Sequence, residues 1–138
     1  MTQKEKELLL KDLCARLPYG VKFACNKNVY TAKGLDLIVT DEGDWEYAIT
    51  AKGIAPIEID FIKPYLFPLS SMTEEQKKEY NYWKHEVPVC HYEYGDVVEE
   101  IELYDSPESF EYLIENHFDY RGLIEKGLAI DATGLNIY

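Results

Sequence analysis

The chain has 138 residues, among them 26 Asp or Glu, 14 Lys or Arg and three Cys, so its formal net charge is -12. This length suits a single domain over residues 1–138, and the apolar runs are too short to span a bilayer. The N-terminus lacks the pattern of a secretory signal and three cysteines cannot all pair, so we expect a cytoplasmic protein without a membrane partner.

The first predicted element is a helix. Thr2 and Glu5 have the spacing of a capping box, in which each side chain bonds to the other residue's backbone N–H. Apolar residues then recur at helical spacing, and the helix should end at Pro18. The expected apolar stripe consists of Leu10, Leu13, Cys14 and Leu17.

Residues 21 to 59 change to the pattern of strands. Short apolar or β-branched runs alternate with turn residues, which predicts an antiparallel meander that forms a sheet or a small barrel. The acidic turn at 41–44 lacks the spacing of a calcium loop and is read as a polar turn. The predicted strands cover residues 21–25, 29–32, 35–40, 45–51 and 54–59.

The middle of the chain predicts a crossing segment and a second helix. Pro64 and Pro68 make a helix over 61–69 improbable because proline lacks a backbone donor, so this stretch is read as an ordered connection. Ser71 and Glu74 have capping-box spacing and predict a helix that runs to about residue 86.

A β-hairpin is predicted next, with strands over 87–94 and 97–104 around a Gly95-Asp96 turn. In this register Cys90 lies opposite Ile101 on an apolar, inward side, while His91 lies opposite Glu100 on an acidic, outward side. A helix over 97–104 is the competing interpretation.

The C-terminal third predicts two more helices and completes an α+β fold. Ser106 followed by Pro107 marks a helix start, and the apolar stripe of that helix extends to His117. Asp119 is placed to cap a short helix over 120–126. The fold class is therefore α+β: an N-terminal helix, an antiparallel meander, then helices and an acidic hairpin.

The negative charge is concentrated in one segment. Residues 85–120 hold 11 Asp or Glu and no Lys or Arg, whereas residues 1–84 are nearly neutral. Such a segment repels phosphates, so we expect no direct binding of nucleic acid and instead a basic protein surface as partner. Tyrosines, which are common in interfaces, accompany the charge. The predicted partner-binding residues are Glu93, Asp96, Glu100, Glu102 and Tyr104.

Catalytic signals are weak. Cys90, His91 and His117 are the candidates for an enzyme, because a nucleophilic cysteine needs a histidine within hydrogen-bond reach. Adjacent residues of a strand point to opposite sides, so Cys90 and His91 are better read as a core cysteine and a surface histidine. No dinucleotide, phosphate-loop or hydrolase motif is present. We expect no cofactor and no metal, and the balance is against an enzyme.

Three stretches of the chain stand out together, and they read LLKDLCARLPYGV at 9–21, IKPYLFPLSSMT at 62–73 and NHFDYRGLIEKGLA at 116–129. They resemble a family of small proteins carried by phages and integrated elements of gut bacteria. The family has no assigned activity, so the resemblance implies an origin but transfers no functional residue.

The leading hypothesis is a non-enzymatic accessory protein that acts by protein contact through the acidic surface at 85–120. One alternative is an acidic mimic of nucleic acid that inhibits a host or defence enzyme by occupying its basic groove. Another is a small enzyme that uses Cys90, His91 or His117.

Overall fold

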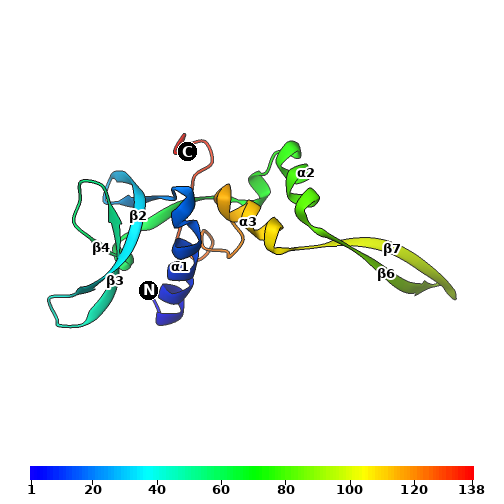
Figure 1. Cartoon of the computed structure of the whole chain (residues 1–138), viewed down its shortest axis with the longest axis horizontal. Coiled ribbons are helices and arrows are strands. Elements are labelled where there is room, and N and C mark those ends of the chain that lie inside the picture. Colours follow the sequence, from blue (N-terminus) through cyan, green and yellow to red (C-terminus); the bar gives the residue numbers. More distant parts are fainter. The chain divides into compact units, whose positions relative to one another are not determined.

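The computed structural model describes residues 1–138 and confirms the α+β fold, with an N-terminal helix, an antiparallel meander in an open sheet, further helices and a hairpin (Figure 1). The chain forms two compact units. The first comprises Met1–Ser71 and Ile114–Tyr138, and the second comprises Met72–Leu113. Our expectation of one domain over 1–138 stays a prediction.

Helix α1 (Gln3–Arg16) begins at the predicted capping box, since the N–H of Glu5 donates to Thr2 Oγ1 at 3.2 Å and the N–H of Thr2 donates to Glu5 Oε1 at 2.9 Å. The predicted apolar stripe is partly wrong, because Cys14 is exposed. A polar pair takes its place in the interior, so the apolar residues alone do not define the buried face. The buried residues of α1 are Leu9, Asp12, Leu13 and Arg16.

The predicted meander is confirmed. Its strands are neighbours in an open sheet of the first unit, in the order β4-β3-β2-β1. The expected break at Lys33 is wrong: one twelve-residue strand runs through it, with a bulge between Ala32 and Gly34 that absorbs the irregularity. The strands are β1 (Lys22–Cys25), β2 (Asn28–Val39), β3 (Trp45–Ala51) and β4 (Ile57–Glu58).

The stretch predicted as a connection is a strand, β5 (Lys63–Pro68), that pairs antiparallel with β1. Its two prolines do not prevent this, because Pro64 and Pro68 stand near the two ends and different partners pair with different parts of it. The later part pairs in parallel with two short strands from the end of the chain, β8 (Phe118–Asp119) and β9 (Ile130–Asp131). β5 therefore ties the C-terminal segment to the meander.

The hydrophobic core of the first unit lies between α1, the sheet and the C-terminal segment. Leu9 and Leu13 of α1 are fully buried in it, together with Phe23 of β1 and Leu66 of β5. Leu123, from the turn after β8, closes the same cluster. Two single-turn helices, η1 (Leu17–Tyr19) and η2 (Ile59–Phe61), connect elements around this core. The core thus joins sequence-distant segments.

The second unit opens with helix α2 (Glu74–Trp83), whose cap differs from the prediction. Thr73 Oγ1 accepts from the N–H of Gln76 at 3.2 Å, and Gln76 reaches back to Thr73. Ser71 instead donates to the carbonyl of Pro68 and belongs to η3 (Leu69–Ser71). The capping box therefore begins two residues later than predicted.

Strands β6 (His85–Glu93) and β7 (Asp96–Tyr104) form a separate two-stranded sheet, so the competing helix over 97–104 is wrong. Helix α3 (Pro107–Glu115) follows and starts as predicted, because Ser106 Oγ accepts from the N–H of Ser109 at 3.0 Å. The helix ends before His117, which has a left-handed φ of 61°. The prediction that His117 extends the stripe of this helix is wrong.

The short helix expected over 120–126 is a series of turns. Asp119 still acts as a cap, since its carboxylate accepts from the N–H groups of Leu123 and Ile124 at 3.0 and 2.9 Å. These two bonds satisfy the backbone donors of the turn without a regular helix. None of the helices is both long enough and apolar enough for a membrane crossing.

Candidate interaction surface

The β6–β7 hairpin turns at Tyr94 and Gly95, which have φ values of 52° and 87°. Positive φ at both central residues is the mark of a type I′ turn, the turn that suits the twist of a two-residue hairpin. The predicted turn at Gly95-Asp96 is therefore wrong by one residue. Asp96 instead pairs with Glu93 and closes the turn.

The observed register changes the opposing partners but keeps the two sides of the ribbon. Cys90 faces Glu99 instead of Ile101, and His91 faces Val98 instead of Glu100. The displacement is an even number of positions, so the side chains of residues 87–93 and 97–104 stay on the sides predicted for them. All five predicted partner-binding residues lie on one side of the ribbon, namely Glu93, Asp96, Glu100, Glu102 and Tyr104. We call this the acidic side.

The opposite, apolar side is open to solvent. Tyr92 is 81% exposed, Val97 62% and Ile101 69%, and Cys90 is exposed as well. Our expectation that Cys90 points inward is therefore wrong, since its side chain is exposed and no third strand pairs with the ribbon. A two-stranded ribbon with uncovered apolar side chains is marginally stable in water, and large exposed apolar patches mark interaction sites.

Interactions on the acidic side are few and short in range. His91 Nε2 lies 3.8 Å from Glu93 Oε2 and 4.0 Å from Glu100 Oε1, so His91 is near Glu100 diagonally although it does not face it. The hydroxyl of Tyr104 donates to Glu102 Oε2 at 2.7 Å, and this bond raises the pKa of Tyr104. These carboxylates are exposed and can accept from a partner.

A network of hydrogen bonds fixes the base of the hairpin. The hydroxyl of Tyr80 and that of Ser109 both donate to Asp105 Oδ1, at 2.5 and 3.0 Å. Burial, followed by the bond to Asp105, raises the pKa of Tyr80. The ring of Tyr80 also stacks on Tyr112 with the centroids 6.3 Å apart. The sequence analysis missed this network, which connects α2, α3 and the end of β7 within the second unit.

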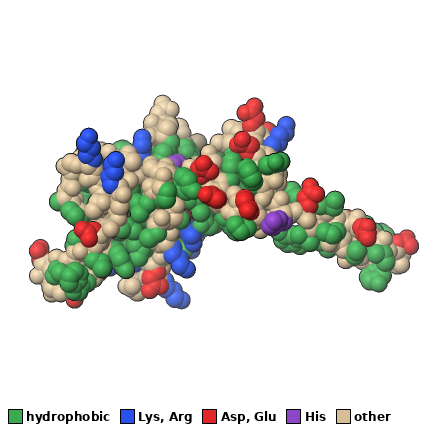
Figure 2. Space-filling view, in the orientation of Figure 1, with side chains coloured by type: hydrophobic (Ala, Val, Ile, Leu, Met, Phe, Trp, Pro, Cys, Tyr) green, Lys and Arg blue, Asp and Glu red, His purple; other side chains and the backbone are tan.

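The second unit carries most of the negative charge. It contains three Lys, no Arg and twelve Asp or Glu. Figure 2 shows the hairpin covered by hydrophobic and acidic side chains, with no Lys or Arg on the strands. Lys84, the closest lysine in sequence, holds its Nζ 4.2 Å above the ring of Tyr80. The hairpin therefore offers a partner acceptors and apolar surface but no cation of its own.

The residues proposed for an enzyme belong to both units, Cys90 and His91 to the second and His117 to the first. Cys90 and His91 lie on opposite sides of the ribbon, and Cys90 Sγ is 3.9 Å from Glu99 Oε1. His117 belongs to the first unit, where it is buried and its ring stacks on Tyr138. No group of three or more His, Cys, Asp or Glu side chains is arranged to hold a metal ion.

Comparison with known proteins does not indicate what this surface binds. No family model, curated protein or solved structure matches the chain. The resemblance to phage-borne proteins therefore stays a prediction, and the interpretation of the surface depends on its own chemistry.

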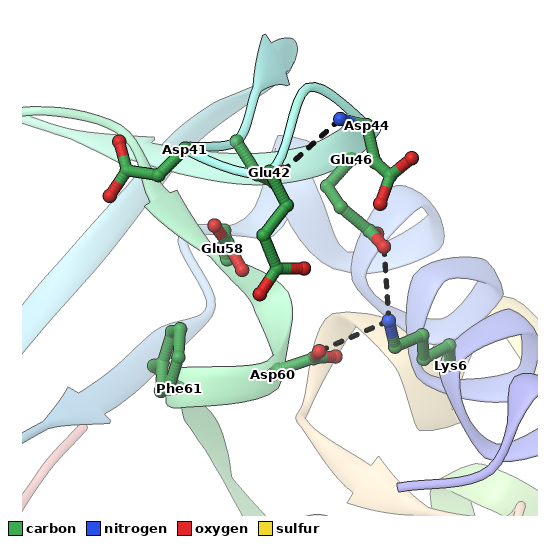
Figure 3. A pocket seen from close by; sticks show the side chains of 9 residues that line it. Lys6, Asp41, Glu42, Asp44, Glu46, Glu58, Asp60 and Phe61 are labelled. Carbon is green, nitrogen blue, oxygen red and sulfur yellow. Dashed lines mark hydrogen bonds and ion pairs between the residues drawn. The ribbon is translucent and has the colours of Figure 1, made fainter.

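A second concentration of carboxylates lines a cavity of about 460 Å³ in the first unit (Figure 3). Lys6 occupies its rim, with Nζ 3.2 Å from Glu46 Oε1 and 3.0 Å from Asp60 Oδ2. These bonds raise the pKa of Lys6. The same two ion pairs join α1 to β3 and η2, so Lys6 has a structural role. The lining carboxylates are Asp41, Glu42, Asp44, Glu46, Glu58 and Asp60.

Replacing Lys6 by Gln is expected to destabilise the protein by about 1 kcal/mol at low ionic strength, because the cluster loses its countercharge. The loss should shrink in high salt, which screens the remaining repulsion. Urea unfolding at two salt concentrations measures it. Lys4→Gln, at an exposed position of the same helix, is the control and should change stability little. Equal effects of the two changes would contradict the role assigned to Lys6.

The buried polar pair of the first unit is Asp12 with Arg16. Arg16 Nε donates to Asp12 Oδ2 at 2.8 Å, and both side chains are fully buried. Arg16 also donates to the carbonyls of Ile114 and Phe118, at 3.3 and 2.6 Å. Arg121 Nε lies 3.3 Å from Asp12 Oδ1. In the sequence, only the i,i+4 spacing of Asp12 and Arg16 indicates that the two residues form an ion pair. This spacing does not show that the pair is buried.

Proposed function

We propose that this protein is a non-enzymatic binding protein whose β6–β7 hairpin docks onto a basic surface of another protein. The observation that carries the proposal is a hairpin exposed on both sides and free of Lys and Arg. Its acidic side presents Glu93, Asp96, Glu100 and Glu102, and its apolar side presents aromatic and aliphatic residues together with Glu86 and Glu99. The partner chemistry is therefore cationic with an apolar component.

The two sides contribute differently to such a complex. Exposed carboxylates speed the encounter with a basic surface through long-range attraction, while each exposed ion pair adds only about 0.2–1 kcal/mol of affinity. Burial of Tyr92, Val97 and Ile101 supplies the larger share, at roughly 25 cal/mol per Å² of apolar surface. Tyrosine is suited to this role because it buries a large ring with few rotatable bonds.

The apolar side also distinguishes this function from mimicry of nucleic acid. A groove that binds phosphates is matched by carboxylates alone, and most of the contacts it makes are polar and charged. Val97 and Ile101 have no counterpart in a phosphate backbone, and their burial favours a protein interface. Protein contact therefore accounts for both sides of the ribbon, whereas mimicry accounts for one.

The decisive experiment captures the partner from the hairpin itself. A photo-crosslinking residue at Tyr92 is expected to capture one protein from an extract of the cells in which the protein naturally occurs, whereas the same residue at Tyr47 of β3 should not. Tyr47 is a fair control because it is also an exposed tyrosine on a strand. Equal capture from both positions would overturn the assignment of the surface.

The captured protein then serves in a measurement of affinity. Changing Glu93, Glu100 and Glu102 together to Gln should weaken its binding about tenfold, since three exposed ion pairs are lost. A matched variant with the same net charge changes three exposed glutamates of the first unit, Glu7, Glu42 and Glu125, and should bind as the parent does. Competition of the captured protein by duplex DNA would instead indicate the mimicry function.

A further inference from the structure

The hairpin has two outer edges, and the register shows which backbone groups each edge exposes. Glu93 and Asp96 close the two-residue turn, and such a closing pair shares both ladder hydrogen bonds. Bonded and non-bonded pairs then alternate along the ribbon. In β7 the residues of the non-bonded pairs direct their N–H and C=O groups away from β6. These residues are Val97, Glu99, Ile101 and Leu103.

The edge of β6 is interrupted. The same alternation directs the backbone of Pro88 outward, and Pro88 has no N–H to donate. A proline on an edge strand blocks pairing with a further strand. The edge of β7 contains no proline and no lysine over its nine residues. Of the two edges, only that of β7 can accept a further strand along its whole length.

The side chains of β7 set the sequence that such a strand needs. On one side of the ribbon an added strand would lie beside Asp96, Glu100 and Glu102. On the other side it would lie beside Val97, Ile101 and Leu103, with Glu99 between the first two. Cross-strand neighbours stabilise each other when their charges are opposite or when both are apolar. The complementary strand therefore alternates Lys or Arg with apolar residues.

We propose that the partner contributes an extended basic strand that pairs with the outer edge of β7 and enlarges the hairpin to three strands. This inference depends on the proposed function and specifies how the partner binds. Backbone hydrogen bonds from the four outward residues of β7 supply affinity, and the alternating side chains supply specificity. A third strand would also stabilise the ribbon, because an isolated hairpin of two strands is only marginally stable.

A second copy of this chain is the wrong occupant for this edge. Pairing β7 with β7 of another copy would bring Glu100 and Glu102 close to the same carboxylates of that copy. Like charges that face each other across strands are destabilising. Charge complementarity therefore selects a different, basic protein.

Amide hydrogen exchange tests the geometry without any variant. The probe is a synthetic peptide in which Lys and Val alternate over the length of β7. We expect its binding to slow exchange at Val97, Glu99, Ile101 and Leu103 and to leave Val98, Glu100 and Glu102 nearly unchanged, since those amides already bond to β6. A peptide with the same sequence except for a Pro at its centre is the control and should not bind.

A proline on the protein side gives an independent test. Ile101→Pro removes an outward N–H, and its opposite neighbour Pro88 shows that this pair of positions tolerates proline within the hairpin. We expect peptide affinity to fall more than tenfold, whereas Ile101→Val should retain it. Unchanged circular dichroism and unfolding midpoint would show that the hairpin persists.

The outcomes separate this inference from the proposed function. Peptide binding that needs the three glutamates but protects none of the four amides overturns strand addition and leaves the acidic surface intact. No peptide binding overturns strand addition, while capture from Tyr92 decides the proposed function separately. A further outcome is slow exchange at the same four amides in the protein without peptide, at a high concentration at which the protein forms a dimer. This outcome would assign the edge to a second copy and overturn the proposal.

Discussion

Replacing Asp12 by Ala is expected to lower the free energy of unfolding by about 3–5 kcal/mol, although Asp12 does not belong to the proposed binding hairpin. The change leaves the guanidinium of Arg16 fully buried without its main countercharge. Arg16 also bonds to the carbonyls of Ile114 and Phe118, so the loss should loosen the C-terminal segment from α1. The pair is thus a cross-link between the two ends of the first unit.

Urea unfolding followed by circular dichroism measures this loss. Glu7→Gln, an exposed acid on the same helix, is the control and should change stability by less than about 0.5 kcal/mol. The double variant Asp12→Ala with Arg16→Met removes both charges and should be more stable than Asp12→Ala alone, because no uncompensated charge stays buried. A cost below about 1 kcal/mol for Asp12→Ala would contradict the description of this pair as a buried cross-link.

Local signals in the sequence predicted the elements that local interactions form. The capping box of Thr2 with Glu5 and the start of α3 at Ser106 were correct because each depends on residues three positions apart. The second capping box was predicted at Ser71 and Glu74, whereas the helix is capped by Thr73 and Gln76. Ser71 instead bonds to the carbonyl of Pro68, and no helix pattern shows that bond.

Features that depend on distant partners could not be predicted. β5 is a strand because β1, β8 and β9 supply its pairs, and two of these partners lie about 50 or more residues further along the chain. Likewise, Asp12 and Arg16 look like an exposed i,i+4 pair, and neither their burial nor their contacts with Ile114, Phe118 and Arg121 can be read from the local sequence. Sequence periodicity counts apolar residues and therefore misses a buried polar pair.

The acidic side of the hairpin was predictable even though its turn was placed one residue too late. Moving the turn by one position changes every opposing pair but keeps each residue on its side of the ribbon. The charge segregation of Glu93, Glu100 and Glu102 survives for this reason. The exposure of Cys90 was not predictable, since it depends on the absence of a covering layer that the sequence does not specify.

His117 should make the stability of the protein depend on pH between about 6.5 and 4. Burial, and then the charges of Arg16 and Lys22, lower the pKa of His117 from 6.5 to about 4 in the folded protein. The imidazole stacks on Tyr138 at 3.9 Å between centroids and has little access to solvent. A proton on this ring is therefore unfavourable in the fold and is accommodated in the unfolded chain.

The sign of the effect follows from this difference in proton binding. Between about pH 6.5 and pH 4 the unfolded chain holds more protons at His117 than the folded protein, so stability falls as the pH falls. The slope is at most about 1.4 kcal/mol per pH unit. Above about pH 6.5 the histidine is neutral in both states and contributes no slope. Urea unfolding at several pH values from about 7 to about 4.5 measures the slope.

The matched variant is His117→Asn, which cannot titrate and whose residue type tolerates the left-handed backbone at this position. It should be less stable at neutral pH, because the stack on Tyr138 is lost, but its stability should be nearly flat through the same window. Glu5 and Asp131, whose pKa values are lowered by hydrogen bonds, begin to contribute only below about pH 4.5. Equal slopes for the parent and the variant would show that other groups cause the acid sensitivity.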